Sequence, residues 1–199
     1  MNFPRWEQLT SKIELPSSTA ERLAAALNAS PSAAVAVVGG EPEAFGTSIA
    51  SRMSSRGVVY SIALSDDVAP AVAPRPVLGH VKLRHRDNDR LPFADASIDL
   101  VLWAFTLRSV GHVARMLSET KRVLRPGGRF AVADWVRQDE AFGPLRDDRV
   151  SAATCQRCLT AGGFGVLGQL MLNASHYLVV GRRPFADMAP LGIGMLNAM

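Results

Sequence analysis

The stretch from Leu91 to Trp135 constrains the fold most, because it holds two apolar runs separated by one amphipathic helical pattern. Residues 97–105, SIDLVLWAF, and 129–135, RFAVADW, are typical of strands that are covered on both faces. Between them, residues 113–124, VARMLSETKRVL, have apolar positions at helical spacing, and the PGG that follows predicts a turn. A strand, a helix and a strand in this order indicate an α/β protein with a mainly parallel sheet.

The rest of the chain extends this alternation of strands and helices. Residues 17–29 have a Ser/Thr cap and predict a helix, and AVAVV at 34–38 predicts a short buried strand. The further expected elements are a helix over 45–56, strands over 58–64 and 80–85, a helix around Cys155, and strands over 165–173 and 176–183. The last two strands are expected to pair antiparallel. The pattern predicts a doubly wound α/β sheet that ends in a hairpin.

Length and composition favour one domain. A chain of 199 residues with 48% hydrophobic and 20% charged residues can bury a core without disulfide bonds. We expect a single domain over 1–199, with a core over about 30–184, a helical segment over 1–29 and an apolar tail over 185–199. No apolar run is long enough to span a bilayer, and the N-terminus has charges and a proline where a signal peptide has its apolar stretch. We therefore expect a cytoplasmic protein that does not enter the membrane.

The charge pattern bears on possible partners. The net charge is +4 and nearly all positive residues are arginines, which raises the question of a nucleic-acid partner. The positive residues are scattered, however, and the densest cluster, KLRHRDNDR at 82–90, is interleaved with aspartates. This pattern is typical of a solvated surface and disfavours nucleic-acid binding. The apolar tail over 185–199 can dock on its own chain or on a neighbour, which leaves a homo-oligomer or a protein partner open.

Cys155 and Cys158 form a CxxC pair inside a predicted helix. A redox pair is expected at the start of a helix, and a metal site needs further ligands that are not found at suitable spacing nearby. A structural role for the pair is therefore favoured, and we expect no metal site. The four histidines are dispersed, and no Ser/His/Asp set or pair of carboxylates marks a catalytic centre, so the catalytic residues stay unassigned.

Three motifs of the central stretch resemble a known family. Leu91-Pro92-Phe93 precedes a strand with Ile98-Asp99-Leu100-Val101, and the next helix leads into Arg122-Val123-Leu124-Arg125-Pro126-Gly127-Gly128. At these spacings the motifs resemble class I S-adenosylmethionine-dependent methyltransferases, above all the small-molecule branch with the ubiquinone and menaquinone C-methyltransferases. The resemblance covers about residues 30–184. It implies a Rossmann-like methyltransferase sheet with a C-terminal antiparallel hairpin and S-adenosylmethionine as cofactor. We expect Asp99 to cap or orient the start of its strand and not to act as a catalyst.

The opening loop departs from the family pattern. The family has an acidic residue, one apolar residue and then Gly-x-Gly-x-Gly, whereas this chain has VVGGEPEAFG. Two alignments are open: with Gly39 as the first glycine, glutamates replace the later ones, and with Gly40 first, a proline and an alanine replace them. Glycine is used there because the backbone must approach the ligand closely. The resemblance implies cofactor contacts at Gly39, Gly40 and Glu41 in a divergent loop.

The next cofactor positions follow the second and third strands. The family's acidic residue, which accepts hydrogen bonds from the ribose hydroxyls, aligns with Ala63, and Leu64 and Ser65 follow as expected contacts. Losing such a charged hydrogen bond weakens binding roughly ten- to a hundredfold. Asp87 aligns with the aspartate that accepts from the adenine amino group, and Asn88 comes after it. The resemblance thus implies a weakened cofactor site.

The remaining candidates follow the fourth and fifth strands. Trp103 and Ala104 stand where the family has small polar residues, and the resemblance implies that they contact the cofactor, although two placements of Trp103 are open. It either narrows the channel for the methionine part of the cofactor or packs in the core. The connection after the fifth strand is short, which predicts an acceptor site that is open or is completed by another segment or subunit. The candidate acceptor contacts are Phe105, Arg108, Asp134 and Trp135.

Three functions are consistent with these observations. The leading hypothesis is an S-adenosylmethionine-dependent methyltransferase of unknown acceptor, small or bulky, with a divergent cofactor loop. The first alternative is a catalytically inactive protein of the same fold that binds the cofactor weakly or not at all and serves as a scaffold or subunit. The second alternative is an RNA-associated methyltransferase. Binding of the cofactor is the observation that separates the first two.

Overall fold

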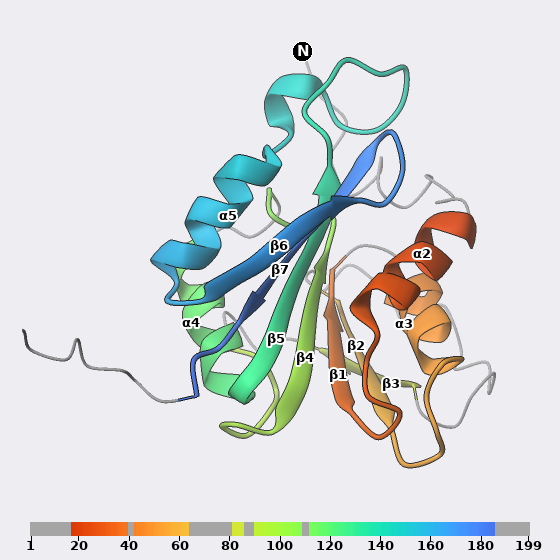
Figure 1. Cartoon of the computed structure of the whole chain (residues 1–199), viewed down its shortest axis with the longest axis vertical. Coiled ribbons are helices and arrows are strands. Elements are labelled where there is room, and N and C mark those ends of the chain that lie inside the picture. Colours follow the sequence, from red (N-terminus) through yellow and green to blue (C-terminus); the bar gives the residue numbers. More distant parts are fainter. Residues whose placement is uncertain (1–16, 40–41, 64–80, 86–89, 109–111, 186–199) are drawn as a thin grey trace, which may run out of the picture.

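The computed structural model describes residues 17–39, 42–63, 81–85, 90–108 and 112–185, and these build one seven-stranded sheet (Figure 1). The strand order is β3-β2-β1-β4-β5-β7-β6. The strands are β1 (Ala34–Val38), β2 (Val58–Ala63), β3 (Val81–His85), β4 (Ile98–Ala104), β5 (Leu124–Trp135), β6 (Gly165–Met171) and β7 (His176–Arg182).

Strands β1 to β5 are parallel, and β7 is the strand that runs in the opposite direction. β1 pairs with β2 on one side and β4 on the other, while β3 and β5 extend the parallel part outward. β7 pairs antiparallel with β5 and with β6. The predicted doubly wound sheet with a C-terminal hairpin is confirmed, including the placement of the two apolar runs of the central stretch in one sheet.

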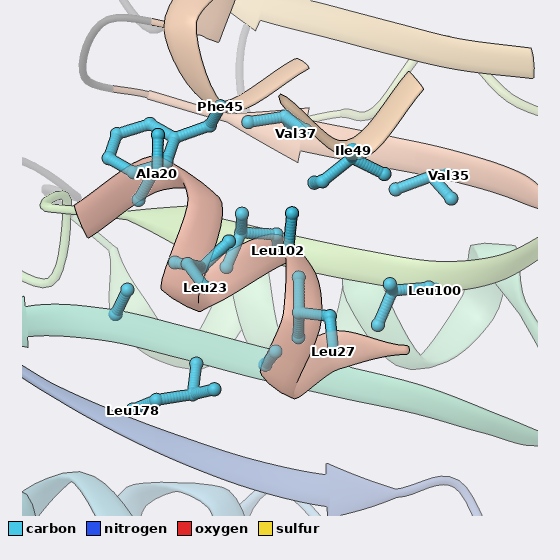
Figure 2. Packing of buried hydrophobic residues seen from close by; sticks show 14 of the residues in the cluster. Ala20, Leu23, Leu27, Val35, Val37, Phe45, Ile49, Leu100, Leu102 and Leu178 are labelled. Carbon is cyan, nitrogen blue, oxygen red and sulfur yellow. The ribbon is translucent and has the colours of Figure 1, made fainter. Parts of the chain in front are cut away.

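Helices cover both faces of the sheet. α2 (Ser17–Leu27) and α3 (Pro42–Ala50) contribute to one apolar cluster, and α4 (Val113–Val123) and α5 (Ala152–Ala161) contribute to the other. Figure 2 shows Leu23 and Leu27 of α2 among Leu100 and Leu102 of β4. Strands covered on both faces are apolar at most positions, which explains the nearly continuous apolar runs in the sequence.

The turn predicted at the PGG is wrong, because these residues belong to β5. Leu124 pairs with Ile98, and the register then shifts so that Arg129 pairs with Leu100. Gly127 has a φ of +78°, and its N–H donates to the Arg183 carbonyl over 3.0 Å. A left-handed glycine therefore makes a bulge inside a strand here instead of a turn before it.

The boundaries of α3 also differ from the prediction of 45–56. The helix begins at Pro42 and ends at Ala50. Proline fits the first helical position because its ring sets a helical φ and its missing N–H would have no partner there. Beyond Ala50, the N–H groups of Arg52 and Met53 bond to carbonyls three residues back, which makes tight turns before Gly57.

Asp99 holds the start of its strand, as expected from its position. Its Oδ2 accepts a hydrogen bond from the Ala34 N–H over 2.8 Å, and Oδ1 lies 2.5 Å from Nη1 of Arg125. These bonds tie the start of β4 to the start of β1 and to the RPGG segment. In the described part of the chain, no helix is long and apolar enough to cross a membrane.

Candidate functional site

The order of the strands defines where a ligand can bind. β1 connects outward to β2 on one side, whereas the chain returns from β3 to β4 on the other side of β1. Neighbouring parallel strands whose connections diverge leave a crevice outside their carboxyl ends, and α/β proteins bind ligands there. In this chain the crevice lies beyond Val38 of β1 and Ala104 of β4. We call it the switch-point edge.

Both strands at the switch-point edge end in left-handed backbone. Gly39 follows β1 with a φ of +84°, and Phe105 follows β4 with a φ of +55°. Each is held by a hydrogen bond across the sheet, from Gly39 N–H to the Ile62 carbonyl (2.9 Å) and from Phe105 N–H to the Ala133 carbonyl (2.8 Å). A left-handed φ is strained for phenylalanine, and such strain is concentrated at functional sites.

The Phe105 side chain belongs to a buried aromatic cluster. Its ring centroid lies 5.7 Å from that of Phe45, 5.9 Å from that of Trp135 and 4.9 Å from that of His176. Trp135 and His176 are themselves 4.3 Å apart, because they are directly paired residues of β5 and β7. We call Phe45, Phe105, Trp135 and His176 the aromatic cluster. It places two of the predicted acceptor contacts, Phe105 and Trp135, side by side.

Asp134 lies next to this cluster and is buried. Its Oδ1 accepts from the Trp135 N–H over 2.7 Å, and its Oδ2 accepts from the Leu107 N–H over 3.3 Å. The carboxyl thus connects the end of β5 to the loop that follows β4. Burial raises the pKa of Asp134 to about 7, although the two N–H donors and the charge of Arg149 act in the opposite direction.

The connection after β5 folds over Trp135 around one buried arginine. The Arg149 guanidinium lies 4.9 Å from the Trp135 ring and donates to the carbonyls of Pro144, Val136 and Phe142. Its Nη1 also lies 2.5 Å from Oε2 of Glu140, and both side chains are shielded from solvent. These bonds order residues 136–149. The short connection therefore packs against Trp135 among the described residues, where an open acceptor site had been one of the expectations.

None of the other predicted site residues that the structure describes belongs to the aromatic cluster. Trp103 packs in the core against Phe130, with the ring centroids 4.9 Å apart, and its Nε1 has no hydrogen-bond partner in the described part. Ala104 is buried on the opposite face, in the cluster with α2 and α3. Arg108 is half-exposed and forms an ion pair with Asp148 instead of reaching the aromatic cluster. The predicted contacts that lie outside the described residues are Gly40, Glu41, Leu64, Ser65, Asp87 and Asn88.

Sequence reasoning missed two residues of this site. His176 and Arg149 lie in segments that carry no recognisable site motif. His176 joins the site only because β7 pairs antiparallel with β5, and Arg149 joins only because residues 136–149 fold back onto Trp135. His176 could have been found from the predicted hairpin, because pairing of β7 with β5 places the start of β7 beside the end of β5.

The described residues fit a cofactor at the switch-point edge. Thr106 follows Phe105, is 2% exposed, and its Oγ1 has no hydrogen-bond partner among the described residues. A buried hydroxyl without a partner is unfavourable, and a polar ligand can satisfy it. Gly39 supplies the left-handed glycine that the family uses where the backbone approaches its ligand. Ala63 ends β2, at the position where the family has its acidic residue.

The cysteines do not contribute to this site. Both lie in α5 and are free thiols, with Cys155 buried and Cys158 half-buried. Burial raises the pKa of the Cys155 thiol, which keeps it protonated and unreactive. Within the described residues, no three His, Cys, Asp or Glu side chains gather as metal ligands would.

Comparisons with known proteins agree with this geometry. Residues 44–132 match the family described as "Methyltransferase domain". The chain is 41% identical over 125 residues to the ubiquinone/menaquinone biosynthesis C-methyltransferase UbiE of Stutzerimonas stutzeri, a match that covers 61% of this chain and 45% of that protein. It is 47% identical over 68 residues to the demethylmenaquinone methyltransferase of Beutenbergia cavernae, covering 34% of this chain and 27% of that one. The chain therefore spans less than half the length of these relatives.

Solved structures show the same fold at lower identity. A SAM-dependent methyltransferase from Aquifex aeolicus superposes with a TM-score of 0.79 at 20% identity, covering 91% of this chain and 99% of that chain. A methyltransferase in complex with the Trm112 activator of Haloferax volcanii gives 0.71 at 17% identity, covering 90% and 93%. The matched domain and the relatives make the chain similar to the class I S-adenosylmethionine-dependent methyltransferases, and the solved structures show that it has their fold. Within that class it is similar to UbiE, as the sequence motifs predicted.

Proposed function

We propose that this chain transfers a methyl group from S-adenosylmethionine to an acceptor that binds at the switch-point edge. The observation that carries the proposal is the pair of left-handed residues, Gly39 and Phe105, at the adjacent carboxyl ends of β1 and β4. The match to the methyltransferase domain supports the cofactor, and the chain's partial coverage of its relatives leaves the acceptor open. Neither the scaffold nor the RNA-associated alternative is favoured by these relatives.

The proposal assigns the cofactor contacts to three strand ends. Gly39, Gly40 and Glu41 follow β1, Leu64 and Ser65 follow β2, and Asp87 and Asn88 follow β3. To these we add Thr106 after β4, whose buried hydroxyl has no hydrogen-bond partner among the described residues. When bound, S-adenosylmethionine supplies a methyl group on a positively charged sulfonium. We expect weak binding, because the ribose carboxylate of the family is replaced by Ala63.

The residues of the chain contribute position and the exclusion of water. Phe105 and Trp135 are nearly fully buried and provide apolar surface beside the switch-point edge. Asp134 holds the loop after β4 through Leu107, so it fixes the loop that carries Thr106. Methyl transfer depends strongly on holding the reacting atoms in line. A general base is needed only for an acceptor that carries a proton on its attacking atom, so none is assigned.

The adenine contact gives the experiment that tests this proposal. We expect Asp87→Ala to weaken the binding of adenosylhomocysteine roughly 5- to 150-fold, because it removes the hydrogen-bond acceptor for the adenine amino group. The measurement is the ligand-induced shift in thermal unfolding. Asp139→Ala is the matched control, since Asp139 is exposed and pairs only with Arg146 among the described contacts. Equal shifts in both variants would show that the cofactor site is placed wrongly.

Partners and location complete the proposal. A second copy or another protein is the expected partner, and four exposed apolar residues on the outer strand β6 bear on it: Val166, Leu167, Leu170 and Met171. One solved neighbour of this fold is itself bound to an activator protein.

The two free cysteines suit a reducing compartment, which supports a location in the cytoplasm.

A further inference from the structure

His176 occupies an unusual position for a histidine. It is the first residue of β7, it is 2% exposed, and its ring packs against those of Phe105 and Trp135 at interplanar angles of 76° and 69°. The directly paired residue on β5 is Trp135. The imidazole is therefore the polar member of an otherwise apolar aromatic cluster at the switch-point edge.

A hydrogen-bond network fixes which ring nitrogen of His176 carries the proton. The Asn173 Oδ1 accepts from the backbone N–H groups of Ser175 and His176, both over 2.8 Å. The amide nitrogen of Asn173 must then point the other way, where it donates to Thr19 Oγ1 (2.8 Å) and lies 3.0 Å from His176 Nδ1. Nδ1 thus accepts a hydrogen bond, so in the neutral ring Nε2 holds the hydrogen.

The Nε2–H group of His176 is buried and makes no hydrogen bond with any of the described residues. Burial lowers the pKa of His176 to about 4, although the nearby Glu140 carboxylate acts in the opposite direction and Arg149 adds to the lowering. The ring is therefore neutral at physiological pH. A buried donor of fixed tautomer and without a partner is unfavourable unless something else binds it.

We propose that the Nε2–H of His176 donates a hydrogen bond to an oxygen atom of the methyl acceptor and holds the acceptor against Phe105 and Trp135. This inference rests on the proposed function, because it assigns the acceptor to the same edge of the sheet. Asn173 is the positioning residue, since its amide keeps the hydrogen on Nε2. Buried polar groups of this kind discriminate strongly against molecules that cannot form the bond.

Two probes of the same shape test the bond directly. Acetophenone offers a carbonyl oxygen, and α-methylstyrene has a methylene group in its place. Each is titrated at millimolar concentration into the full chain, and the nitrogen resonances of His176 are followed by NMR. We expect acetophenone to shift the Nε2 resonance and to bind about two- to tenfold more tightly than α-methylstyrene. Equal affinities with an unmoved Nε2 resonance would overturn the proposal and show that the ring faces of the cluster satisfy the N–H.

Variants separate the hydrogen bond from the packing. His176→Phe keeps an aromatic ring but removes the donor, so the preference for acetophenone should disappear. His176→Gln places an amide N–H close to the position of Nε2 and should keep the preference even if the phenylalanine variant does not fold. His112→Phe is the matched control, because His112 is exposed at the start of α4 and makes no side-chain capping bond. A preference that survives in His176→Phe would contradict the assignment.

The two proposals fail in distinguishable ways. Absence of adenosylhomocysteine binding would refute the proposed function, yet the response of Nε2 to acetophenone can still be measured without the cofactor. Conversely, a chain that binds adenosylhomocysteine but shows no probe preference would keep the proposed function and lose the role of His176. We expect His176→Phe to leave the affinity for adenosylhomocysteine unchanged, because the assigned cofactor contacts follow β1 to β4.

Discussion

Two buried ionisable side chains at the switch-point edge respond to pH in opposite directions. Asp134 has a pKa raised by burial to about 7, whereas His176 has one lowered by burial to about 4. The contribution of Asp134 to stability is fully present below about pH 4 and is lost as pH rises through 7. That of His176 is present above about pH 6.5 and is lost as pH falls toward 4.

Asp134→Asn isolates the first of these effects. The variant cannot ionise at this position, so the difference in unfolding free energy between wild type and variant should depend on pH. As pH rises from 5 to 7, we expect wild type to lose stability relative to the variant by on the order of 2 kcal/mol. Chemical denaturation at pH 5, 6 and 7 measures this, and the titration of His176 cancels because both proteins contain it. A difference that is constant with pH would contradict the assigned pKa.

Among the structural elements, the connection between β5 and α5 is the one that shapes the acceptor side. Gly143 lies in it with a φ of +82°, and an added Cβ would meet the Trp135 indole at 2.8 Å. Gly143→Ala should therefore destabilise the chain by about 1–3 kcal/mol, through both the strained φ and the clash. Gly168→Ala in β6 is the matched control, because nothing lies within 4 Å of its added Cβ. Equal unfolding free energies of the two variants would show that this connection does not pack on Trp135.

The sequence predicts which helices and strands form better than it predicts where they begin and end. Apolar runs over residues 100–104 and 130–133 identified β4 and β5, because the middle of a strand covered on both faces is mostly apolar. Because polar and apolar residues do not alternate in such a run, the sequence does not show which face of the sheet a side chain occupies. The placement of Trp103 in the core could therefore not be predicted. A PGG is equally compatible with a turn and with a bulge, since both use left-handed glycine. The position of Gly127 within β5 depends on the Arg183 backbone, which lies far along the chain.

The sequence could anticipate the place of a candidate residue only where the family motif and a strand end coincide. Gly39, Phe105 and Trp135 lie at or beside the switch-point edge, and their contacts with cofactor or acceptor stay predictions. Arg149 and His176 owe their roles to chain reversals that bring distant residues together, and no local spacing encodes them. The assignments of Asp87 and Asn88 to the adenine lie outside the described residues and stay predictions.

For the molecule as a whole, the central claim is that the switch-point edge binds S-adenosylmethionine despite its divergent loop. Isothermal titration calorimetry of the full chain with adenosylhomocysteine and S-adenosylmethionine tests this most directly. We predict dissociation constants in the tens to hundreds of micromolar, roughly one to two decades weaker than a low-micromolar site, because Ala63 replaces the ribose carboxylate. No heat and no thermal shift at millimolar ligand would contradict the account and leave a methyltransferase fold that serves as a scaffold.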